Sequence, residues 1–153
     1  MNRPPKPAPA FTLKPGESIS FVLPVTPRTK KNHGKVVQRG PRKFHVPSEA
    51  YTTMEGQIVA WAHDIPGNVL VGCVVWCACE LNLTQPLNCC AIFYRDADRG
   101  DAVGYYQGLA DALEAAGVVA DDKWIKQWDG SRLAKDANRP RIEVTLTAVS
   151  DDT

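Results

Sequence analysis

Three aspartates, Asp101, Asp121 and Asp122, flank one short amphipathic segment and are the residues of this sequence best suited to chemistry. Carboxylates that come from the start of a helix and from the turn beyond its end can converge on a hard divalent cation. Mg²⁺ is usually bound by one or two carboxylates, while phosphate oxygens and water complete its coordination. The spacing therefore predicts a metal site suited to phosphodiester cleavage. The same spacing is also typical of a capped helix followed by an acidic surface turn.

Charge is segregated along the chain, although the formal net charge is only +1. Residues 28–43 contain seven basic side chains and no acidic one, whereas residues 95–122 contain seven acidic side chains and two arginines. A basic segment can neutralise phosphates while an acidic cluster holds a metal ion, and this combination suits a nuclease. A solvated polar loop and an acidic helix would carry the same charges without that function.

The composition is ordinary for a soluble globular protein: 153 residues, 44% hydrophobic and 23% charged. We expect one domain over residues 16–150, preceded by a mobile proline-rich tail over residues 1–15. No apolar run is long enough to span a bilayer, and the N-terminus lacks the apolar core of a signal peptide. The sequence therefore predicts a soluble, cytoplasmic protein.

The five cysteines lie in apolar, strand-like stretches, and none forms a Cys-x-x-Cys pair. We interpret them as small buried hydrophobic residues in a reducing compartment. The alternative is a zinc-stabilised structural module built on Cys77, Cys79, Cys89 and Cys90.

Hydrophobic periodicity predicts a mixture of strands and helices, an α+β fold. Ser48 is expected to cap one helix, and Asp101 a second helix that ends at Gly117. Strands are expected at 18–25, 69–83, 87–94 and 141–146, with a small hairpin around Gly40-Pro41.

Two glycines, Gly104 and Gly108, lie one turn apart in the second predicted helix. Glycine lowers helix stability, so this pair predicts a close approach by a phosphate backbone or by another helix. Tight packing within the chain would explain it equally well.

Several segments together resemble the RusA-like Holliday junction resolvases, small endodeoxyribonucleases of bacteria and their phages. The resemblance covers residues 18–147, nearly the whole chain without its tail, and no single motif decides it. Near the N-terminus it rests on Thr29-Lys30-Lys31-Asn32 and Pro47-Ser48-Glu49-Ala50-Tyr51. In the middle it rests on Phe93-Tyr94-Arg95-Asp96, Asp111-Ala112-Leu113, Ala116-Gly117-Val118 and Asp121-Asp122. Toward the C-terminus it rests on Asp129-Gly130-Ser131-Arg132 and Pro140-Arg141-Ile142-Glu143-Val144.

The chain departs from the core motif of this family at three positions. An alignment on Asp111-Ala112-Leu113 puts Val103 at a metal-binding aspartate, Gly104 at an asparagine and Gln107 at a lysine. Asp98, or less readily Asp96, is expected to supply the missing carboxylate from the loop before the helix. An alternative register places Asp96 and Asp98 in the paired positions, followed by an insertion.

The resemblance implies an α+β domain with a mixed sheet and flanking helices, and a homodimer. It also implies an Mg²⁺-dependent, structure-selective endonuclease that resolves Holliday junctions or other branched DNA, with Mn²⁺ as a substitute. Asp101 and Asp122 would bind the metal directly, with Asp121 and Asp98 in support. The expected DNA contacts are Arg28, Lys30, Lys31, Asn32, Lys35 and Arg132.

Two further possibilities follow from individual residues. The missing groups at Val103 and Gln107 favour a branched-DNA-binding protein of the same fold that has lost cleavage. Trp124 and Trp128 flank the Asp121-Asp122 pair and can stack either on unpaired bases or within the protein.

Overall fold

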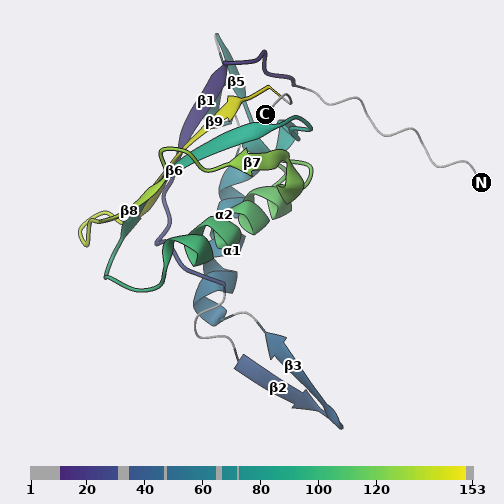
Figure 1. Cartoon of the computed structure of the whole chain (residues 1–153), viewed down its shortest axis with the longest axis vertical. Coiled ribbons are helices and arrows are strands. Elements are labelled where there is room, and N and C mark those ends of the chain that lie inside the picture. Colours follow the sequence, from purple (N-terminus) through teal and green to yellow (C-terminus); the bar gives the residue numbers. More distant parts are fainter. Residues whose placement is uncertain (1–10, 31–34, 47, 65–66, 72, 151–153) are drawn as a thin grey trace, which may run out of the picture.

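In the computed structural model, which describes residues 11–30, 35–46, 48–64, 67–71 and 73–150, a mixed five-stranded sheet carries two helices on one face (Figure 1). Strand β9 (Arg141–Ala148) is antiparallel to both of its neighbours, β1 (Ser18–Leu23) and β6 (Leu87–Arg95). Strands β7 (Ile125–Gln127) and β8 (Arg132–Lys135) run parallel to β6 and pair with its first and second halves. The chain is therefore a small single-domain α+β protein.

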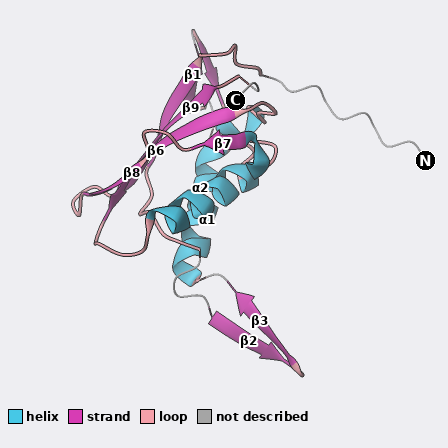
Figure 2. Ribbon diagram, in the orientation of Figure 1, coloured by secondary structure: helices cyan, strands magenta, loops and turns pink. Residues whose placement is uncertain are grey.

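One face of the sheet is apolar because buried residues alternate with more exposed ones along the three long strands. Ile19, Phe21 and Leu23 of β1 are buried, and β6 and β9 show the same alternation. Successive side chains of a strand point to opposite faces, so all three strands present their apolar side to the helices (Figure 2). The alternation that the sequence predicted for the first and last strands is confirmed.

Helices α1 (Glu49–Ala62) and α2 (Ala102–Ala115) begin at the caps that the sequence predicted. Ser48 accepts a hydrogen bond from the Tyr51 N–H at 3.1 Å. Helix α1 buries Tyr51, Met54 and Ile58, and α2 packs beside it. Within the described residues, no helix has both the length and the apolar character needed to cross a bilayer.

Two hairpins flank this core. The hairpin expected around Gly40-Pro41 is confirmed as β2 (Lys35–Arg39) and β3 (Arg42–Val46), which extend away from the sheet (Figure 1). The single strand expected over 69–83 is wrong. This stretch forms β4 (Val69–Val71) and β5 (Val74–Trp76), then the short helix η1 (Ala78–Glu80). The chain reverses between the paired Val71 and Val74, so the alternating cysteines do not share one sheet face.

The predicted tail is partly ordered. Leu13 is only 3% exposed, and its backbone N–H and carbonyl both bond to the Gln85 side chain at 2.8 Å. Phe11 packs against Trp76. Residues 11–15 therefore belong to the domain, and residues 1–10 lie outside the described part of the chain.

Candidate functional site

Asp101 begins helix α2. Its Oδ1 accepts a hydrogen bond from the Gly104 N–H at 2.9 Å, which is the geometry of a helix N-cap. The capping role is confirmed, and the metal-binding role of Asp101 stays a prediction.

At the other end of α2 the chain reverses and brings three carboxylates together. Gly117 adopts a left-handed conformation with φ of 81°, as glycine commonly does just after a helix. The helix η2 (Asp122–Trp124) follows after a short connection. As a result, Glu114, Asp121 and Asp122 each offer a carboxylate oxygen within 4.8 Å of the others. The structure thus joins Asp121 and Asp122 to a glutamate that the sequence did not single out.

Hydrogen bonds orient this cluster but leave its negative charge in place. The Asp122 N–H donates to Glu114 Oε1 at 2.9 Å, and the Lys123 N–H donates to Asp121 Oδ1 at 2.9 Å. The Lys123 hydrogen bond lowers the pKa of Asp121. Desolvation, a hydrogen bond with Asp121 and the charges of Glu114 and Asp111 raise the pKa of Asp122. None of the three clustered carboxylates forms an ion pair among the described residues. The charge of Lys123 acts on Asp121, so three carboxylates face one nearby cation and the site keeps a net negative charge suited to a metal ion.

Asp101 and Asp122 do not come together in one chain. Helix α2 has 14 residues between them, and at about 1.5 Å per residue this helix is about 21 Å long. Two oxygen ligands of one Mg²⁺ each lie about 2.1 Å from it and hence about 4 Å or less from each other. A single copy of the chain therefore does not close the metal clamp predicted across this segment.

The two carboxylates expected to fill the gap at Val103 lie at the Asp101 end of α2. Asp96 accepts two hydrogen bonds from the Arg28 guanidinium, at 3.1 and 3.3 Å. Partial burial alone would raise the pKa of Asp96, but the hydrogen bonds and charge of Arg28 outweigh it and hold that pKa below its usual range. Asp98 is 75% exposed and pairs with Arg95. Neither residue joins the Asp122 cluster.

A cation does reach the middle of α2, from a distant part of the sequence. Lys30 Nζ lies 3.1 Å from Asp111 Oδ2, and the Gln107 amide donates to Asp111 Oδ1 at 3.1 Å. Asp111 is close enough to Asp122 to raise its pKa. Lys30 therefore places a positive charge beside Gln107, the residue that the alignment with the RusA-like motif puts at a lysine.

The glycine pair in α2 accommodates the segment that carries Lys30. A Cβ on Gly104 would lie 3.2 Å from Thr29 Cγ2. A Cβ on Gly108 would lie 3.1 Å from Tyr51 Cε2 and 3.4 Å from the Arg28 carbonyl oxygen. Tight packing within the chain thus explains both glycines, and it fixes the path of residues 28–30 across the helix.

The structure describes only some of the other residues expected to contact DNA. Arg132 is exposed at the start of β8, and Lys35 begins β2. Lys31 and Asn32 lie outside the described residues. The DNA-binding role of all these residues stays a prediction.

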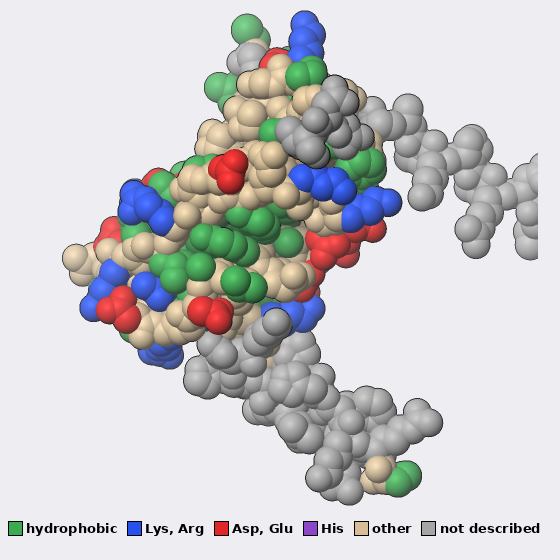
Figure 3. Space-filling model, viewed as in Figure 1, with side chains coloured by type: hydrophobic (Ala, Val, Ile, Leu, Met, Phe, Trp, Pro, Cys, Tyr) green, Lys and Arg blue, Asp and Glu red, His purple; other side chains and the backbone are tan. Residues whose placement is uncertain are grey.

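Trp128 stacks on Tyr106 of α2, with ring centroids 4.9 Å apart and planes inclined by 8°. Both rings are half-buried, which favours packing within the protein. More generally, hydrophobic side chains gather in the middle of the face of the molecule that Figure 3 shows. Trp124 instead lies under Lys123 Nζ, 5.3 Å from its ring centroid.

The cysteines do not form a metal site in the described part of the chain, where the one cluster of potential ligands is the carboxylate group. All five thiols are free. Burial is confirmed only for Cys89, whereas Cys73 is exposed and Cys77, Cys79 and Cys90 are intermediate.

Sequence reasoning missed Glu114 and Arg99. Glu114 lies one turn after Asp111 and three residues before Gly117, so a reversal at this glycine was the available signal. Arg99 lies beside Arg28 at the start of α2, a proximity that no local pattern predicts.

No protein-family model matches the chain, and no curated protein matches its sequence.

Proposed function

We propose that this chain is a divalent-metal-dependent endonuclease that cuts branched DNA, of the RusA-like type that its motifs resemble. The observation that carries the proposal is the carboxylate cluster of Glu114, Asp121 and Asp122, with which no described side chain forms an ion pair. A basic segment crosses the same helix. Together they offer one place for a metal ion and another for phosphates.

The donor set fits Mg²⁺. The three residues are carboxylates, the ligand type that hard divalent cations prefer, and they are partly open to water and to a phosphate. Mn²⁺ accepts the same ligands. When bound, such an ion would activate a water molecule and neutralise charge on the scissile phosphate.

Lys30 has the position of a phosphate-stabilising cation. Its ammonium group reaches Asp111, beside the cluster, and the Lys30 side chain is 40% exposed. Because it is held by one carboxylate, it can turn part of its hydrogen-bonding capacity toward a DNA phosphate. We assign to Lys30 the role that Gln107 cannot fill.

Two copies of the chain would give Asp101 a place in the site. Because α2 holds Asp101 and Asp122 apart, Asp101 joins the cluster only from a second copy whose α2 runs antiparallel to the first. A two-fold axis generates this arrangement twice, which gives a dimer two equivalent sites. A four-way junction has two equivalent strands to cut, so this symmetry suits the substrate.

The test is cleavage of a synthetic four-way junction with Mg²⁺. We expect wild-type cleavage, its abolition by Asp122→Asn, and no effect of Asp64→Asn, which removes an exposed carboxylate outside the cluster. Junction binding without wild-type cleavage would reject the enzyme and leave a branched-DNA-binding protein, the reading favoured by Val103 and Gln107. Full cleavage by Asp122→Asn would reject the metal site.

A further inference from the structure

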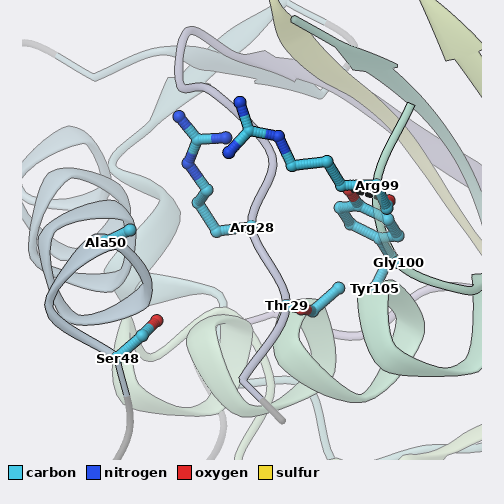
Figure 4. A pocket seen from close by; sticks show the side chains of 7 residues that line it. All are labelled: Arg28, Thr29, Ser48, Ala50, Arg99, Gly100 and Tyr105. Carbon is cyan, nitrogen blue, oxygen red and sulfur yellow. Dashed lines mark hydrogen bonds between the residues drawn. The ribbon is translucent and has the colours of Figure 1, made fainter. Parts of the chain in front are cut away.

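A cavity of about 300 Å³ opens between the starts of the two helices. Its walls include Arg28, Thr29, Ser48, Arg99 and Tyr105. Figure 4 shows the Arg28 and Arg99 guanidinium groups side by side at one edge of the cavity, with Ser48 and Thr29 at its other sides. The cavity lies at the Asp101 end of α2 and is separate from the carboxylate cluster.

Only one of the two arginines pairs directly with a carboxylate, although the charge of Arg99 also acts on Asp96. Arg28 uses two of its five N–H donors on Asp96. The Arg99 guanidinium forms no ion pair or hydrogen bond within the ranges that the structure describes. One positive charge at this edge is therefore unmatched by a direct partner, and several donors remain for an oxyanion.

The surrounding backbone adds to this positive field. Helices α1 and α2 both begin beside the cavity, at Ser48 and Asp101, and the N-terminus of a helix carries a partial positive charge and unpaired N–H groups. Each cap satisfies one of these N–H groups, so others remain. The carboxylates of Asp101 at α2 and of Glu49 in the first turn of α1 oppose this field. The donors in excess at the cavity are therefore those of Arg28 and Arg99.

The size and lining of the cavity limit what can enter. About 300 Å³ is at the lower end of the range for small-molecule sites, enough for one phosphate and its sugar but not for a duplex. The Tyr105 ring is buried against Phe93, and it provides an apolar wall beside Arg99, whose carbonyl accepts a hydrogen bond from its hydroxyl at 2.6 Å.

We propose that this cavity binds a phosphate group, namely a backbone phosphodiester of a DNA strand, through Arg99 and Arg28. The identification of DNA as its source rests on the proposed function. Arg99 contacts the phosphate directly, and Asp96 holds Arg28 in place for the second contact. Within one copy of the chain, the phosphate site and the metal site lie near opposite ends of α2, a helix about 21 Å long. In the antiparallel dimer proposed above, the cavity of one copy would lie on the same side as the carboxylate cluster of the other.

The test is junction binding in EDTA, where cleavage does not occur, measured by fluorescence anisotropy over a series of salt concentrations. We expect Arg99→Gln to raise Kd about 10-fold, the usual effect of losing a charge-assisted hydrogen bond. The slope of log K against log salt should fall by about 1, as for one lost phosphate contact. Lys14→Gln removes the same charge beyond the far end of β1, where Lys14 is exposed, and should change Kd less than twofold.

Arg28→Gln should act in the same direction. The Arg28→Gln variant also breaks the ion pair with Asp96, so its thermal unfolding is measured first. Arg99 is exposed and forms no ion pair within the described residues, so Arg99→Gln tests the cavity without that complication. Wild-type affinity and salt slope in Arg99→Gln would overturn the proposal.

Two further probes separate the possible sources of phosphate. Inorganic phosphate and a deoxynucleoside monophosphate are titrated into the wild type and Arg99→Gln. Weak binding that depends on Arg99, together with Arg99-dependent junction binding, supports a backbone site. The opposite result is tight binding of the free mononucleotide together with junction binding that does not depend on Arg99. It would make the cavity a nucleotide site and overturn the DNA assignment. Failure of Asp122→Asn to affect cleavage would reject the proposed metal site without altering these binding results.

Discussion

The two ends of helix α2 are both rich in aspartate, yet their electrostatics are opposite. At the start of the helix, Arg28 neutralises Asp96 and holds its pKa low. Beyond its end, burial and neighbouring carboxylates raise the pKa of Asp122. A carboxylate count does not distinguish these ends, whereas the partners of each carboxylate do. One end is suited to an anion and the other to a cation.

One segment connects the two ends. Residues 28–30 cross α2 over its glycines, and they send Arg28 toward Asp96 and Lys30 toward Asp111. The basic segment therefore contributes to both sites in different ways. Four changes test this division of roles.

The largest effect is expected from Glu114→Gln. It removes one carboxylate of the cluster while keeping a side chain that accepts the Asp122 N–H, so the loss is one of charge. We expect junction cleavage to fall at least about 10²-fold, as for other groups that stabilise charge in a transition state. Glu80→Gln, at an exposed site outside the cluster, is the matched control. Unchanged cleavage in Glu114→Gln would remove this residue from the site.

Lys30→Gln should separate cleavage from binding. Glutamine is a polar replacement that removes the charge beside the cluster. We expect cleavage to fall about 10²-fold. Junction affinity in EDTA should fall less than it does in Arg99→Gln. Single-turnover cleavage at saturating protein, measured beside anisotropy, distinguishes the two effects. Equal losses in both assays would make Lys30 a simple DNA contact.

Gly108→Ala should destabilise the protein by about 1 kcal/mol, because an overpacking cost of about 2 kcal/mol outweighs the gain in helix propensity of about 1 kcal/mol. The new methyl group would lie 3.1 Å from the Tyr51 ring, which cannot move easily because its hydroxyl donates to the Gly108 carbonyl at 2.9 Å. The control is Gly56→Ala in α1, where a Cβ meets nothing within 4 Å. This change should raise the free energy of unfolding by about 1 kcal/mol. Denaturant unfolding measures both. A gain of stability in Gly108→Ala would show that the segment over α2 is not tightly held.

Asp96→Asn should have the smallest effect, about 0.5 kcal/mol at neutral pH, typical of a partly exposed ion pair. The folded state lowers the pKa of Asp96, so its contribution to stability is present above the pKa of the unfolded chain. That contribution disappears as the pH falls through the lower folded value. The unfolding free energies of wild type and variant should therefore converge at acidic pH. A difference that persists there would have another cause than this ion pair.

Local features of the fold were predictable from the sequence, and the long-range contacts were not. Caps at Ser48 and Asp101 and the glycine after α2 follow from residue type alone. The prediction of one strand over 69–83 was wrong because the chain reverses between Val71 and Val74. This reversal leaves no mark on the apolar pattern of the sequence.

The candidate site shows the same limit. Spacing suggested that Asp101 and Asp122 converge, but a straight helix keeps its ends apart however its sequence is aligned. Lys30 and Asp111 are 81 residues apart in the chain, and only the packing of residues 28–30 against α2 brings them together. The net negative charge of the Glu114 cluster likewise depends on the reversal at Gly117.

In the proposed dimer, the Asp101 end of one α2 and the Asp122 end of another form one active site. The most direct test mixes two inactive variants, Asp101→Asn and Asp122→Asn, by co-expression with different tags, and measures junction cleavage by the mixed dimers. Asparagine also caps helices well, so Asp101→Asn removes the charge without loss of the helix start. We predict that each variant alone is inactive. Free mixing should restore about a quarter of the wild-type activity, because half of the dimers are mixed and each has one intact site. Cleavage by Asp101→Asn alone, or no recovery in isolated mixed dimers, would contradict the account.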